Sequence, residues 1–166
     1  MKTPILIILL FLISSQVYSQ VVELDEVEIT AVNYKYLNAV DSDQNAIKVK
    51  DLEEKVALFD LKNSDYYNDE YDTYYVTFFI PDGKILAAYD KNGKLIRTIE
   101  KFKNVKLPNT VSDAIVERFP NWAMVGDIYK VNFHEGNETA KKQYKVSLKN
   151  GDKQMKVKLD ENGNFL

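Results

Sequence analysis

Two segments of the chain, 70 residues apart, carry the same alternation of apolar residues. The matching residues are Tyr74, Val76 and Phe78 in the first segment and Tyr144, Val146 and Leu148 in the second. In each segment a second alternating run follows a short turn, Pro81-Asp82-Gly83 or Asn150-Gly151-Asp152, and ends at an Asp-x-Asn-Gly sequence. Alternate side chains of a strand point to opposite faces, and Asn-Gly favours hairpins. Each segment therefore predicts an antiparallel β-meander, and the offset predicts an internal repeat.

Helices are expected ahead of both meanders. Residues Val49 to Phe59 place apolar side chains at helical spacing. A second helix is expected between Pro108 and Pro120, with Thr110 and Asp113 in the positions of a capping box. An additional strand, Asp127 to Phe133, follows this helix. The polar stretch Lys62 to Asp72 is expected to be a loop.

The N-terminus has the layout of an export signal. Lys2 is followed by an apolar run, Pro4 to Ile13, and by a polar stretch with a cleavage site after Ser19. A membrane anchor is the alternative, but spanning a bilayer takes about 20 apolar residues. The chain has no Cys, so the cysteine of a lipoprotein signal is missing. We expect a cleaved, lipid-free protein.

The expected organisation is a signal peptide (1–19), an N-terminal extended segment (20–48), a first helix-plus-meander unit (49–106) and a second one (107–166). This is an α+β fold of tandem helix plus antiparallel β-meander units. Without Cys the fold holds no disulfide, so its stability must come from packing.

Charge is unevenly distributed along the chain. After removal of the signal peptide, 21 basic and 25 acidic residues remain, which argues against general nucleic-acid binding. Residues 20–72 hold 14 acidic and 5 basic residues, whereas residues 73–166 hold 11 acidic and 16 basic ones. The N-terminal third either docks on the remainder through this polarity or presents a separate solvated surface.

The first meander is apolar on both faces, unlike the second, whose outward positions are mostly lysines. Its outward set is Tyr75, Thr77, Phe79, Leu86 and Ala88. A solvated sheet face does not have this composition, so something is expected to cover it. Either the extended segment Glu26 to Leu37 packs there, or a partner protein or peptide does. The expected partner-binding residues are Tyr75, Phe79 and Leu86, with Tyr66, Tyr67 and Tyr71 of the loop.

No pattern predicts catalysis, a metal or a cofactor. His134 is the only histidine, and paired-histidine chemistry needs two. The Asp160 to Asn164 turn resembles the start of a calcium loop but lacks the later bidentate Glu. We expect the carboxylates of the acidic stretch Asp65 to Asp72 to be solvated rather than to bind a cation. We expect a protein without catalytic residues, metal ligands or cofactor.

The region from Tyr74 to Leu166 resembles the PepSY-like family, related in fold to the β-lactamase inhibitor protein and found as secreted proteins of Bacteroidetes-type bacteria. The resemblance rests on the helix from Leu107 to Pro120, on Trp122, on the following strands and on the closing turn Asp160 to Phe165. It implies a tandem helix-and-sheet architecture, a periplasmic or secreted location and a binding role through aromatic residues of a sheet face. It brings no catalytic residues.

We therefore expect a non-enzymatic envelope protein that binds a protein or peptide partner, without nucleic acid or stable membrane insertion. The alternative is a structural or accessory subunit of a periplasmic or outer-membrane complex. An enzyme is the third hypothesis.

Overall fold

The computed structural model describes residues 33–42 and 44–166. The expected signal peptide and residues 20–32 lie outside the described residues. The elements follow in the order α2 (Tyr34–Val40), α3 (Ile47–Ala57), β1 (Thr73–Ile80), β2 (Gly83–Asp90), β3 (Leu95–Lys103), α4 (Asn109–Arg118), β4 (Ala123–His134), β5 (Lys141–Asn150) and β6 (Lys153–Leu159).

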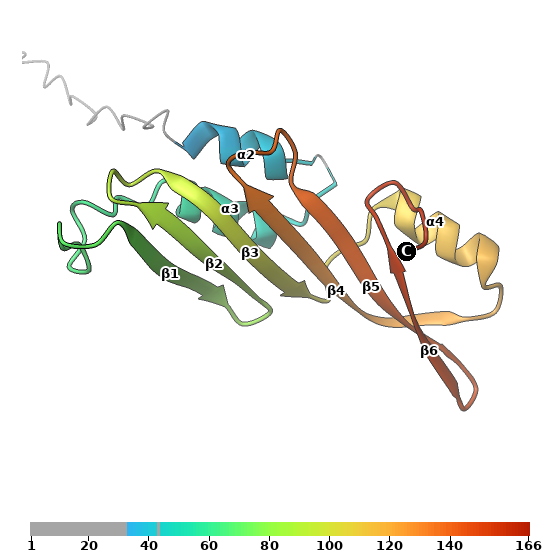
Figure 1. Cartoon of the computed structure of the whole chain (residues 1–166). Coiled ribbons are helices and arrows are strands. Elements are labelled where there is room, and N and C mark those ends of the chain that lie inside the picture. Colours follow the sequence, from blue (N-terminus) through green and yellow to red (C-terminus); the bar gives the residue numbers. More distant parts are fainter. Residues whose placement is uncertain (1–32, 43) are drawn as a thin grey trace, which may run out of the picture.

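All six strands form one antiparallel sheet whose spatial order is the order of the sequence. The helices lie on one side of this sheet (Figure 1). Helix α3 precedes β1–β3, and helix α4 precedes β4–β6. The expected α+β class, with a helix ahead of each antiparallel meander, is confirmed. The internal repeat and the unit boundaries stay predictions.

The strand register follows the offset of 70 residues. Tyr74 pairs with Tyr89 in the first meander, and Tyr144 pairs with Leu159 in the second. The two-residue turns also correspond, because Ile80 pairs with Gly83 and Asn150 with Lys153. The two hairpins therefore place equivalent positions of the sequence on the same face of the sheet.

The two Asp-x-Asn-Gly turns share one hydrogen-bonding pattern. Asp90 Oδ1 accepts from the backbone N–H groups of Asn92 and Lys94, and Asp160 Oδ1 accepts in the same way from Asn162 and Asn164. Only the glycines adopt positive φ, 83° at Gly93 and 85° at Gly163. Asn92 and Asn162 do not adopt positive φ.

The inner face of the sheet and the helices form one core. Helix α3 buries Val49, Leu52 and Val56, and α4 buries Val111 and Ile115. Phe102, Tyr129 and Tyr144 stack in succession across β3, β4 and β5. Each fully buried side chain of this size contributes about 1.5–3 kcal/mol of stability.

Helix α4 begins without the expected capping box. Its N-cap is Pro108, which forms no side-chain hydrogen bond. Thr110 lies inside the first turn instead, and its Oγ1 donates to the backbone oxygen of Glu161 at 2.8 Å. The threonine hydroxyl therefore ties the helix to the last turn of the chain and is not free to cap.

Residues Tyr34–Val40 form a helix, so the expectation of an extended segment is wrong there. The reason is the spacing of Tyr36, Ala39 and Val40, all buried, which share one face of a helix but would alternate between the faces of a strand. The loop expected at residues 62–72 is observed.

The last glycine turn provides a test of this packing. A Cβ at Gly163 would lie 2.5 Å from the Thr110 carbonyl oxygen, whereas a Cβ at Gly93 would have Leu61 Cβ at 4.0 Å as its closest neighbour. Both substitutions to Ala strain a positive φ, at a cost of about 1 kcal/mol. Gly163→Ala adds a backbone clash of about 2 kcal/mol. We expect urea unfolding to show Gly163→Ala as clearly the less stable variant. Equal losses would contradict the close contact between this turn and α4.

Candidate functional site

The outer face of β1, β2 and β3 exposes a cluster of large apolar side chains, here called the apolar patch. Its members are Tyr75, Phe79, Leu86 and Ile99, which are 72%, 78%, 37% and 41% exposed. They are brought together by the strand register, which pairs Leu86 with Ile99 and Phe79 with Lys84. Their sequence neighbours on the inner face supply the core, so the patch is not needed to build it.

The N-terminal segment does not cover the apolar patch within the described residues. Tyr36 lies on the inner face, where its ring meets Phe133 edge-on at 5.2 Å and its hydroxyl donates to Glu100 Oε1 at 2.9 Å. Asn33 is also buried, and it accepts from Leu95 N at 2.8 Å and donates to Ala57 O at 3.0 Å. Packing of Glu26 to Leu37 on the outer face, one of the two alternatives from the sequence, is therefore wrong for residues 33–37. Residues 26–32 lie outside the described part of the chain.

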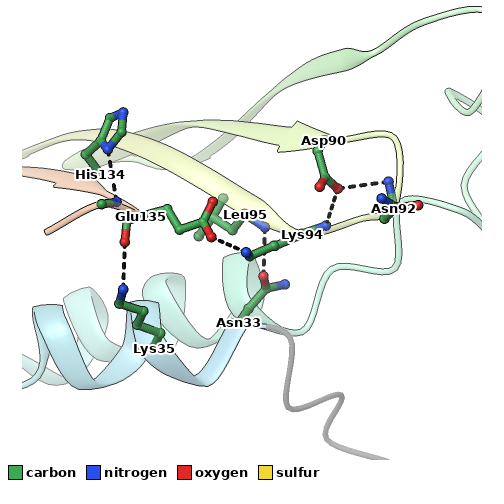
Figure 2. Close-up of polar contacts among 9 residues, drawn as sticks. Asn33, Lys35, Asp90, Asn92, Lys94, Leu95, His134 and Glu135 are labelled. Atoms are coloured by element: carbon green, nitrogen blue, oxygen red, sulfur yellow. Dashed lines mark hydrogen bonds and ion pairs between the residues drawn. The ribbon is translucent and has the colours of Figure 1, made fainter. Parts of the chain in front are cut away.

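Figure 2 shows how the start of α2 is fixed at the end of the sheet. Lys35 Nζ donates to the backbone oxygen of Glu135 at 2.7 Å, and the carboxylate of Glu135 pairs with Lys94. Asn33 and Leu95 complete the link between α2 and β3. These contacts hold α2 on the helix side, so residues 33–40 do not cover the outer face.

The loop tyrosines divide into two groups. Tyr66 and Tyr71 are exposed and line a hollow of about 440 Å³ beside β1, together with Tyr75. Tyr67 is half-buried and stacks on Tyr74 with ring centroids 5.6 Å apart. Of the six expected binding residues, Tyr66, Tyr71 and Tyr75 thus share one hollow, and Phe79 and Leu86 extend the same face. Tyr67 packs against the sheet.

Ile99 belongs to the patch but was missed from the sequence. Its neighbour Arg97 also faces outward, and the two line a small hollow with Tyr75 and Leu86. The sequence holds an indication of both residues, because Leu95–Lys103 alternates between faces. Thr98, Glu100 and Phe102 are buried, and Arg97 and Ile99 lie next to them on the outward face. Recognising β3 as a strand of the same sheet would have identified both residues.

His134 lies exposed at the end of β4, where its Nδ1 accepts from the backbone N–H of Gly136 at 3.1 Å (Figure 2). This bond holds the turn that follows the strand. Within residues 33–42 and 44–166, no cluster of three His, Cys, Asp or Glu residues has the arrangement of a metal site. In the same ranges no helix has the length and apolar character needed to cross a membrane.

Two carboxyl groups are buried between the helices and the sheet, and neither was predicted from the sequence. Glu53 on α3 is 2% exposed and Glu100 on β3 is 1% exposed. Glu100 Oε1 accepts from Tyr36 and from Thr98 Oγ1 at 2.7 Å, whereas Glu100 Oε2 and Glu53 Oε1 have no hydrogen-bond partner among the described residues. The sequence indicates their burial only through their positions, because each lies on a face whose other residues are mostly apolar.

Burial raises the pKa of both Glu53 and Glu100 above the ordinary glutamate range. For Glu53 the negative charge of Glu100 adds to the effect, while Lys142 opposes it. For Glu100 the hydrogen bonds from Thr98 and Tyr36 favour the charged form and offset part of the rise in pKa. The protonated form of Glu53 is therefore the favoured one in the fold.

This pair predicts a pH dependence of stability. Because both pKa values are raised, the folded protein binds more protons than the unfolded chain, and the free energy of unfolding falls as pH rises above the ordinary glutamate pKa of about 4.3. Glu53→Gln keeps the shape of the neutral form. We expect it to stabilise the protein by about 1–3 kcal/mol at pH 8 and much less at pH 5. Thermal unfolding across this range measures the effect, with Glu54→Gln as the exposed control. An unchanged pH slope in Glu53→Gln would contradict the assignment.

Comparison with known proteins finds a similarity to a solved structure. No protein-family model and no curated protein matches the chain. A BLIP-like protein from Bacteroides fragilis NCTC 9343 is similar in structure, with 18% sequence identity and a TM-score of 0.33. The match covers 58% of this chain and 66% of that chain, just under two thirds of its length. A structural similarity of this size says nothing about the function of this chain. The resemblance to the PepSY-like family stays a prediction.

Proposed function

We propose that the protein is an exported, non-enzymatic binding protein of the bacterial envelope, which engages a protein or peptide partner through the apolar patch. The observation that supports this most is the exposure of Tyr75 and Phe79 on a regular strand. Export is supported by the signal-peptide layout of residues 1–19.

A sheet face is a favourable place for such residues. Tyr75, Phe79 and Leu86 are held by strands that pair along their whole length, so little backbone freedom is lost when a partner binds. Aromatic side chains have few rotatable bonds and large contact area, which makes them frequent centres of binding energy. The hollow between Tyr66, Tyr71 and Tyr75 provides a place for a partner side chain beside the patch.

The second candidate is a structural or accessory subunit of a periplasmic or outer-membrane complex. In that case the same patch is covered permanently. Size-exclusion chromatography separates the two, because a constitutive subunit with an uncovered apolar face is expected to aggregate when purified alone. A monodisperse protein favours a binding protein that meets its partner reversibly.

Alanine variants test the proposed surface. Tyr75→Ala and Phe79→Ala remove exposed side chains, so we expect stability to change by about 0.5 kcal/mol or less. Capture of an envelope partner is expected to weaken about tenfold or more for each. Tyr34→Ala removes an exposed tyrosine from the helix side and is the matched control. Recovery of the same partner by all three variants, or of no partner by the unmodified protein, would contradict the proposal.

A further inference from the structure

The outer face of the sheet is strongly basic beyond the apolar patch. The register of β2–β6 places ten basic side chains at outward positions: Lys84, Arg97, Lys101, Lys103, Lys130, Lys141, Lys145, Lys149, Lys156 and Lys158. We call this set the basic field. The only acidic residue at an outward position of β1–β6 is Asp90, whose carboxylate is used by the turn that follows β2. The basic field therefore stands out in a chain whose net charge is −3.

Among the described residues, no ion pair neutralises the basic field. The ion pairs among the described residues use Lys48, Lys50, Lys91, Lys94 and Lys142, and none of these lysines belongs to the field. Acidic residues are concentrated before residue 73, and those described lie on α3 and in the segments on either side of it. The outer face thus presents positive charge to whatever approaches it.

Several of these lysines lie directly opposite one another. Lys84 pairs with Lys101, and Lys101 pairs with Lys130, which forms one row across β2, β3 and β4. Lys145 and Lys158 are opposed in the same way on β5 and β6. Like charges in facing positions destabilise a sheet by a few tenths of a kcal/mol or more. An anion bound between them would relieve this repulsion.

The row of lysines begins at the apolar patch. Phe79 pairs with Lys84, so the aromatic ring and the three lysines lie along one line across the sheet. A hollow of about 340 Å³ opens here, lined by Phe79, Lys84, Lys101, Lys103 and the Pro81–Gly83 turn. This hollow fits a ligand in which an apolar group lies next to an acidic one.

We propose that the outer face binds an acidic stretch of a partner polypeptide, with carboxylates over the basic field and apolar side chains on the patch. This second proposal rests on the proposed function, and it specifies that the partner is acidic and partly apolar. Outward side chains recur about every 6.7 Å along a strand, which matches the alternate side chains of an extended peptide. A simple polyanion would leave Tyr75, Phe79 and Leu86 unused. A planar lipid surface fits poorly, because the sheet twists markedly between β1 and β6 (Figure 1).

The test uses the purified protein and defined probes. A random copolymer of Glu and Tyr supplies charge with aromatic groups, polyglutamate supplies charge alone, and vesicles containing phosphatidylglycerol supply an anionic membrane. We expect the copolymer to bind most tightly, with an affinity that falls as salt concentration rises. Lys101→Gln is expected to weaken this binding about threefold to tenfold, and Lys101→Glu with Lys130→Glu more than tenfold. Phe79→Ala should weaken binding of the copolymer and leave polyglutamate binding unchanged.

Thermal unfolding shows whether a variant binds less well without being less stable. Lys101→Gln removes the middle charge of the row, so the free variant is expected to melt at the same or a slightly higher temperature while it binds less well. Lys55→Gln on the exposed part of α3 is the matched control and should leave copolymer binding unchanged.

Three results would overturn the proposal: equal effects of Lys101→Gln and Lys55→Gln, tighter binding of the vesicles than of the copolymer, or no copolymer binding at low salt. An envelope partner that requires Tyr75 and Phe79 but is insensitive to Lys101→Gln would overturn the acidic assignment and leave the proposed function standing.

Discussion

Pairing of β3 with β4 is the contact on which the rest of the structure depends. It joins the two meanders into one sheet, with Phe102 opposite Tyr129 and Glu100 opposite Val131 on the inner face. A single sheet has only two faces, and the described helices α2, α3 and α4 cover the same one. The apolar patch, on β1–β3, and the basic field, on β2–β6, therefore share the opposite face.

The local parts of this fold could be predicted from the sequence, because strand alternation and turn residues act over a few positions. The hairpin register around Tyr74 and Tyr144, the helices before each meander and the exposed side of Tyr75 and Phe79 follow from such patterns. The join between β3 and β4 could not, since it links residues separated by a helix. Knowing that join would have added Ile99 and Arg97 to the candidate site.

Helix α2 and the two buried carboxyl groups were not predicted from the sequence, and the physical reason is the same for both. Helix α2 has only seven residues, too few for the periodicity of Tyr36, Ala39 and Val40 to stand out from an extended pattern. Glu53 and Glu100 look like solvated carboxylates in the sequence, yet tertiary packing buries them between the helices and the sheet. In both cases the outcome was decided by contacts with distant residues, Glu100 with Tyr36 among them. Local propensity carries no information about such contacts.

The helix layer does not remove the repulsion within the basic field, because α3 carries three lysines beside its three carboxyl residues. Packed layers lie about 10 Å apart, and the Debye length at physiological ionic strength is about 8 Å. Attraction between the acidic groups of α3 and the lysines across the sheet is therefore well screened. Lys101 and Lys130 face each other, and the Cβ atoms of facing residues lie about 5 Å apart. Repulsion between these two lysines is therefore screened less. Lys101 and Lys130 lie outside the core, so the proposed anionic partner is what would offset their cost to folding.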